Sequence, residues 1–233
     1  MNPTRYLSIL AAGLAALALS ACGGMGGKSS QLYVLNPPTD VKTDAAGNLN
    51  ARLAITIPDA PAYLDTTRIA LSHSATTTDY FASADWTDRA PVLVQNALVK
   101  SFEGSGKLKA VFRDTGMFTA EYQLQTELRS FEAQYTGSKG PPSVVVRLAI
   151  KLIKQPDRDI VGSHVAEKTV QADQNNLNSI VGAFNTALGA ILQQTVDWTL
   201  RTIPVKPAKP VHKRKRAKAP KPAAETQPAT PQQ

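Results

Sequence analysis

Cys22 is the residue with the clearest chemistry, and it is the only cysteine among the 233 residues. An apolar run from Leu7 to Leu19 precedes it, Arg5 is the only charge before that run, and the run ends in Leu-Ser-Ala-Cys. A positive start, a short apolar segment and small residues before a cleavage point are typical of a secretory signal peptide. The last four residues also have the form of a lipobox. We therefore predict that residues 1–21 are a signal peptide and that Cys22 becomes the first mature residue, carrying diacylglycerol and an acyl chain.

Two alternatives to a lipobox are an ordinary signal peptide with a chance cysteine and a short buried helix. The apolar run is shorter than the roughly 20 residues that a membrane-spanning helix needs. Because Cys22 has no second cysteine to pair with, a disulfide within one molecule is excluded. Acylation therefore explains the thiol of an exported protein better than redox chemistry does.

Catalytic patterns are absent from the sequence. The three histidines, His73, His164 and His212, form no pair at metal-ligand spacing, and none stands beside a glycine-flanked serine. No glycine-rich nucleotide-binding motif occurs either. We therefore predict no enzyme, no metal and no cofactor other than the lipid on Cys22.

A second group of chemically distinct residues is the basic cluster Lys213, Arg214, Lys215 and Arg216. Residues 204–233 hold eight lysines and arginines against one glutamate, a formal charge of +7, and they are rich in Pro and Ala. This composition predicts a disordered tail. The cluster could bind a polyanion, either anionic lipid or the peptidoglycan of the cell wall; the alternative is a tail that only improves solubility. Nucleic acid is not an expected partner of an exported protein.

The part of the chain between signal and tail is neutral, with seventeen basic and seventeen acidic residues. Its charge therefore creates no field for a large polyanion. Residues 22–30 are rich in Gly and Ser and predict a flexible tether. Residues 31–203 have the length of one domain.

Two kinds of hydrophobic periodicity run through that domain. Alternating residues predict strands at 32–35, 49–57, 68–72 and 77–81, and a three-stranded antiparallel meander at 122–129, 144–152 and 160–170. Helical spacing predicts a helix at 88–104, with Asp88 as its cap and Pro91 in its first turn, and a helix at 175–201. The expected fold is α+β: a mainly antiparallel mixed sheet with two amphipathic helices on one face.

Several short motifs, in this order along the chain, resemble the ABC-type transport auxiliary lipoproteins. The resemblance covers residues 32–203. Besides Tyr33-Val-Leu35 and the last helix, the motifs are Pro61-Ala-Tyr63-Leu64-Asp65, Asp79-Tyr80-Phe81, Trp86-Thr-Asp88-Arg-Ala-Pro91 and Tyr122-Gln-Leu124 with Leu128 and Phe131. We expect Tyr63, Leu64, Asp65, Trp86, Asp88 and Pro91 to be structural anchors of this pattern, since large aromatic residues are more often core than ligand contacts.

The resemblance implies a lipoprotein facing the periplasm that works with a permease, an ATPase and an MCE-domain protein to move lipid between membranes. The lipoprotein of the Pqi system is similar. Such a protein would dock the MCE assembly at the outer membrane of a Gram-negative type envelope, and the resemblance also allows a homo-oligomer. Gly23 after Cys22 agrees with an outer-membrane address. The alternative function is an outer-membrane assembly or envelope-tethering lipoprotein whose basic tail is its main functional element.

Overall fold

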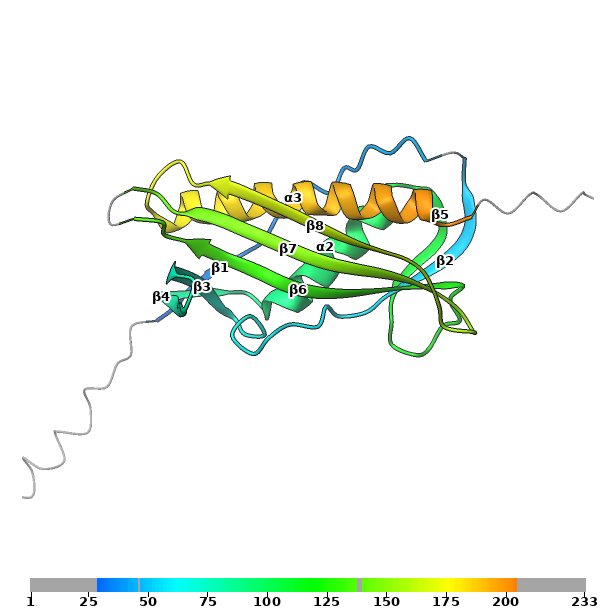
Figure 1. Cartoon of the computed structure of the whole chain (residues 1–233), viewed down its shortest axis with the longest axis horizontal. Coiled ribbons are helices and arrows are strands. Elements are labelled where there is room, and N and C mark those ends of the chain that lie inside the picture. The colour runs from blue at the N-terminus through cyan, green and yellow to red at the C-terminus, as the bar shows by residue number, and fades with distance from the viewer. Residues whose placement is uncertain (1–28, 46, 138–139, 205–233) are drawn as a thin grey trace, which may run out of the picture.

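Three long antiparallel strands form one side of the sheet in the computed structural model, which describes residues 29–45, 47–137 and 140–204 (Figure 1). These strands are β6 (Tyr122–Gln134), β7 (Ser143–Lys154) and β8 (Asp159–Gln171). β6 pairs with β7 from Tyr122↔Lys154 to Gln134↔Ser143, and β7 pairs with β8 over nearly its whole length. The predicted meander is confirmed.

The other edge of β6 is shared by two shorter strands. β2 (Leu49–Ile55) lies parallel to the start of β6, and β3 (Arg68–Ser74) lies parallel to its end. β5 (Leu108–Arg113) extends the sheet beside β2, while β4 (Thr77–Trp86) and then β1 (Gln31–Tyr33) extend it beside β3. The eight strands make one mixed sheet in which the long pairings are antiparallel.

Both helices cover the same face of this sheet (Figure 1). α3 (Leu177–Thr202) lies across β7 and β8, and α2 (Ala90–Gly104) packs against β5, β2 and α3. The apolar stripe of α3 is fully buried at Leu188, Ile191 and Leu192. This arrangement confirms the predicted α+β fold with two helices on one face.

The alternation of side chains in β6 explains why only one face is covered. Leu124, Thr126 and Leu128 are buried under the helices, whereas Gln125 and Glu127 between them are exposed. Successive side chains of a strand point to opposite faces, so the polar set lies on the other side of the sheet. We call that side of β6, β7 and β8 the uncovered face.

The two helix starts test the predicted caps. Asn176 is the cap of α3, and its side-chain oxygen accepts a hydrogen bond from the N–H of Ser179 at 2.9 Å. The predicted cap of α2 at Asp88 is wrong: the helix begins at Ala90 with Arg89 at the cap position. The Asp88 carboxylate accepts instead from the N–H of Arg89, one residue too early to reach the first turn.

A segment between β1 and β2, residues 36–45, follows α3 along its length. The N–H of Asn36 donates to the Asn185 side chain at 2.8 Å, and further along the N–H of Lys42 donates to the Gln193 side chain at 3.0 Å. We call this segment the strap. It connects the two ends of the sheet without adding a strand.

The ends of the described chain, Ser29 and Pro204, lie at opposite ends of the domain's long axis (Figure 1). Within the described residues, neither helix is long and apolar enough to cross a membrane. The predicted signal peptide, Cys22 and the basic cluster at 213–216 lie outside the described residues.

Candidate binding site

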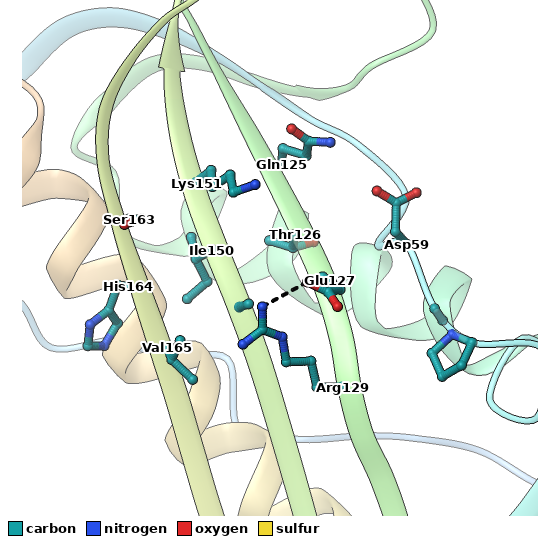
Figure 2. Close-up of a pocket in the computed structure, with 13 residues that line it drawn as sticks. Asp59, Gln125, Thr126, Glu127, Arg129, Ile150, Lys151, Ser163, His164 and Val165 are labelled. Carbon is teal, nitrogen blue, oxygen red and sulfur yellow. Dashed lines mark hydrogen bonds and ion pairs between the residues drawn. The ribbon is translucent and has the colours of Figure 1, made fainter.

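A hollow of about 780 Å³ lies in the middle of the uncovered face (Figure 2). The row Glu127, Ala149 and Val165 crosses the hollow, since these residues are paired partners on β6, β7 and β8. Ala149 and Val165 form its apolar floor. Val165 leaves 44% of its surface exposed there. The lining residues are 59–61, 125–127, Arg129, 149–151 and 163–165.

One wall of the hollow is a single backbone bridge between β2 and β3. The N–H of Asp59 donates to the carbonyl of Thr126 at 2.9 Å, and its carbonyl accepts from the N–H of Leu128 at 2.7 Å. This bridge fills the gap that β2 and β3 leave along the edge of β6. Figure 2 shows Asp59 on this separate segment, beside the strands.

Two of the predicted anchor residues, Leu64 and Asp65, form hydrogen bonds directly after this wall. The N–H groups of Leu64 and Asp65 both donate to the carbonyl of Pro61, closing a tight turn directly after the wall. The Asp65 carboxylate accepts from the Arg89 guanidinium at 2.7 and 3.0 Å, just before α2. The motif therefore ties the wall of the hollow to the start of a helix.

Backbone hydrogen bonds tie the same turn to β4 and α2. The N–H of Trp86 donates to the carbonyl of Thr67 at 2.6 Å, and the N–H of Ala90 donates to the carbonyl of Thr66 at 3.2 Å. The second bond satisfies an N–H of the first helical turn, which has no partner inside the helix. The Thr66 carbonyl thus accepts a hydrogen bond from the start of the helix, a role that the sequence analysis predicted for the Asp88 side chain.

Tyr63 lies half-buried over β4 on the far side of the turn. The hydroxyl of Tyr80 donates to the Tyr63 carbonyl at 3.2 Å, and the Arg68 guanidinium stacks 3.8 Å above the Tyr80 ring. Burial, and then the negative charge of Glu132, raise the pKa of the Tyr63 phenol. The phenol therefore stays neutral well above physiological pH, and the Tyr63 side chain packs against the core.

Charges of both signs line the hollow. Glu127 and Arg129 form an ion pair at 3.0 Å on β6, and both side chains are about half exposed (Figure 2). Asp59 stands on the wall and Lys151 on β7. Such a surface offers hydrogen-bond donors and acceptors around a small apolar floor, which suits contacts with a polar partner surface.

Ser163 and His164 are both among the residues that line the hollow, but they do not form a catalytic pair. Ser163 and His164 are consecutive residues of β8, so their side chains point to opposite faces and do not form a nucleophile and base pair. The His164 ring stacks on Trp198 of α3, with centroids 5.5 Å apart. Within the described residues, no three His, Cys, Asp or Glu side chains are grouped to hold a metal ion.

Trp86 belongs to the core. Its exposed fraction is 1%, and its ring lies 5.9 Å from Phe131 and 5.2 Å from Phe184 between centroids. Leu64 and Pro91 are also buried, while Asp88 is exposed. The structure places these residues at one junction, away from the floor of the hollow.

Sequence reasoning missed the residues that make the hollow. In the sequence, Glu127, Arg129 and Lys151 are only polar residues that alternate with apolar ones along a predicted strand. The signal that could have found them is the pairing of three such strands, because their polar sets then share one face. The wall at Asp59 depends on a long-range bridge and leaves no local signal.

Comparison with known proteins gives a family and a fold. The family model described as the ABC-type transport auxiliary lipoprotein component matches residues 33–196. An uncharacterized protein of Bradyrhizobium diazoefficiens, bll6063, is 29% identical over 180 residues, which are 76% of this chain and 47% of that protein. The chain thus spans about half the length of the curated relative it matches.

Solved structures agree with this result. The crystal structure of protein XCC0632 from Xanthomonas campestris superposes with a TM-score of 0.69 at 25% identity, covering 74% of this chain and 96% of that one. A crystal structure of an uncharacterized protein gives a TM-score of 0.58 at 13% identity, covering 74% and 99% of the two chains. At 13% identity, the similarity to this second structure shows only that the two proteins share a fold.

Proposed function

The chain belongs to the ABC-type transport auxiliary lipoprotein family, and from this we propose that it is a non-enzymatic accessory subunit of an MCE-type lipid transporter. In this role it docks the MCE-domain protein at the outer membrane, while a permease and an ATPase of the same system drive transport. The motifs from Tyr33 to Phe131 and the family match support the accessory role.

We assign the uncovered face of the sheet to the MCE-domain partner. The opposite face is already buried by α2 and α3 and is not open to a partner. On the uncovered face, the hollow combines an apolar floor with charged and amide side chains. Its wall is held by the backbone hydrogen bonds between Asp59 and β6, so the site is formed before a partner arrives.

The lipid on Cys22 is the proposed attachment to the outer membrane. The lipobox and Gly23 support this anchor and this address. Residues 22–30 would then serve as a tether of roughly 20 to 25 Å when stretched, which keeps the domain close to its membrane. The proposed domain boundaries are residues 31 and 203, with residues 204–233 as a separate basic tail.

Co-purification of the MCE-domain protein tests the docking face. Val165→Glu places a charge on the apolar floor of the hollow, and we expect it to lower recovery of the MCE-domain protein about tenfold. Thr169→Glu is the matched control: it lies four residues along the same strand, on the same face and outside the hollow. This control should leave recovery unchanged.

Equal recovery with both variants would rule out the hollow as the docking site. If the unaltered chain recovers no MCE-domain protein at all, the transport function itself is wrong. In that case the envelope-tethering function becomes the better account, and a deletion strain should show detached envelope with normal lipid transport.

A further inference from the structure

Two opposite charges that line the hollow are unpaired within the part of the chain that the structure describes. Lys151 on β7 and Asp59 on the wall are both exposed, and neither forms an ion pair with a described residue. The remaining carboxylate and guanidinium of the hollow, on Glu127 and Arg129, neutralise each other at 3.0 Å. The hollow therefore offers one positive and one negative position to a ligand.

Strand pairing determines how far apart these two charges stand. Asp59 pairs with Glu127, Glu127 pairs with Ala149, and Lys151 lies two residues further along β7. Two strand spacings across and two residues along place the Cα atoms of Asp59 and Lys151 about 12 Å apart. In Figure 2 the Lys151 side chain extends from β7 towards β6, the side on which Asp59 stands. A ligand that fits between them carries a negative and a positive group on one short linker.

Lys151 is the middle member of a row of three hydrogen-bond donors. It pairs with Gln125 on one side and with Ser163 on the other, and all three residues line the hollow. Paired residues of neighbouring strands share a face, so an amide, an ammonium and a hydroxyl stand side by side, about 5 Å apart. Such donors around one cation bind an oxyanion through charge-assisted hydrogen bonds. The row therefore suits a phosphate.

The wall is negative and suits a cationic amine. Asp59 and Glu127 are bridge partners, so two carboxylates lie together, and Arg129 offsets only one of them. A primary ammonium has three donors for such a pair. A quaternary ammonium is typically held by aromatic rings, and no Phe, Tyr or Trp is among the described residues that line the hollow. The wall therefore favours a primary amine.

The apolar floor completes the order of chemistry across the hollow. Val165 lies on β8, which pairs only with β7 among the described strands, so the sheet ends there. From the wall to this edge the hollow presents carboxylates, then the Lys151 ammonium, then the exposed side chain of Val165. Amine, phosphate and acyl chain follow one another in the same order in a phospholipid. The volume of about 780 Å³ is that of a site for a single ligand.

We propose that the hollow binds the headgroup of a phospholipid that carries a primary amine. The phosphate accepts from Gln125, Lys151 and Ser163, the ammonium donates to Asp59, and the first carbons of the acyl chains lie over Val165. This inference rests on the proposed function, because the same face is assigned to the MCE-domain partner, which would close the hollow over the headgroup. It adds a class of lipid and the residues that select it.

Saturation-transfer NMR tests this proposal on the full-length mature lipoprotein in phosphatidylcholine nanodiscs. The probes are dihexanoylphosphatidylethanolamine and the same short-chain lipid with a choline or a glycerol headgroup, each below its micelle concentration. Empty nanodiscs give the background of probe that enters the bilayer. We expect the dissociation constant of the ethanolamine lipid to be about tenfold lower than those of the other two, since only its headgroup satisfies both charges with hydrogen bonds.

Two variants remove one charge each. Lys151→Gln should weaken the binding of all three probes about tenfold, because each of them carries the phosphate. Asp59→Asn should abolish the preference for ethanolamine over choline. Lys154→Gln and Asp157→Asn are the matched controls, because both residues are exposed and lie outside the hollow, and they should leave binding unchanged. Thermal unfolding of each variant checks that the fold is intact.

Equal affinity for the three headgroups, unchanged binding by Lys151→Gln, or a preference for ethanolamine that survives Asp59→Asn would overturn the proposal. A preference for the glycerol headgroup would overturn it in favour of an anionic lipid. These measurements contain no MCE-domain protein, so their failure is distinguishable from failure of the proposed function. If lipid binding fails while Val165→Glu still lowers recovery of the MCE-domain protein, the docking function stands without the lipid site.

Discussion

Trp86, the largest side chain of the Trp86–Pro91 motif, is buried because it belongs to a cluster of three aromatic rings at the centre of the core. Trp86, Phe131 and Phe184 come from β4, β6 and α3, and each ring contacts the other two with centroids 4.8 to 5.9 Å apart. Aromatic pairs at such distances add stability beyond the area that they bury. The cluster therefore joins the meander, the β3–β4 hairpin and the long helix in one contact.

Trp86→Ala should lower the free energy of unfolding by about 3 to 5 kcal/mol, because it leaves a large cavity among rings that cannot close it. Urea denaturation measures this loss. Trp198→Ala is the comparison, since Trp198 is only partly buried against the core, and it should cost less than half as much. Equal losses would show that the aromatic cluster is not the centre of stability.

The ion pair between Arg52 and Glu121 gives a prediction for pH. The Arg52 guanidinium donates to Glu121 at 3.0 Å, and this hydrogen bonding holds the pKa of the Glu121 carboxyl below its ordinary value. A lowered carboxyl pKa contributes stability above the unfolded pKa, and that stability is lost as pH falls through the folded pKa.

Glu121→Gln should therefore lower the urea midpoint at pH 7, and the difference from the unaltered protein should shrink below the ordinary glutamate pKa of about 4.3. Glu103→Gln, at the exposed end of α2, controls for the loss of one negative charge. A midpoint difference that stays constant from pH 7 to pH 3 would contradict the role of this pair.

Residue types predicted some of these positions and not others. Trp86 and Leu64 were predictable as core because large apolar residues rarely remain exposed in number. Asp88 was a wrong cap because a backbone carbonyl from Thr66, distant in sequence, satisfies the helix instead. The residues of the hollow, such as Glu127 and Arg129, acquire meaning only from strand pairing.

At the scale of elements, the strap and α3 fit closely at one glycine. A Cβ at Gly189 would lie 2.9 Å from Cδ of Pro38 in the strap, closer than real Cβ atoms approach. Gly182 lies two turns earlier on the same helix, and a Cβ there would meet nothing within 4 Å. Of the two glycines, only Gly189 lies against the strap.

Gly189→Ala should therefore destabilise the domain by about 1 to 2 kcal/mol through overpacking against the strap. Gly182→Ala should stabilise it by about 0.5 to 1 kcal/mol, because alanine favours the helix and loses less conformational freedom on folding. Thermal or urea unfolding of the two variants measures both effects. A stabilising Gly189→Ala would show that the strap does not pack on the helix.

The helices and the meander were predictable because their periodicity is long and regular. The stripe of α3 recurs over 26 residues, and β6 alternates from Tyr122 to Leu128. β5, which is six residues long and contains two lysines or arginines within Leu108–Arg113, was not predicted. β5 pairs in parallel with β2, which is distant in sequence, and a pairing of this kind cannot be predicted from the residues of β5 alone.

At the scale of the whole molecule, two parts of the chain have proposed tasks. Cys22 would attach the chain to the outer membrane, and the uncovered face would hold the MCE-domain protein. The helical face is occupied by α2, α3 and the strap. A domain with one closed and one open face can add a partner without rearranging its core.

Photo-crosslinking in living cells tests the central claim, that the uncovered face holds the MCE-domain protein. A photoreactive amino acid is placed at Ala149 or Val165 in the hollow, and at Lys100 or Thr186 on the exposed backs of the helices as controls. We predict crosslinks to the MCE-domain protein from Ala149 and Val165 and none from the helix positions. Crosslinks from Lys100 or Thr186 with none from the hollow would contradict the account.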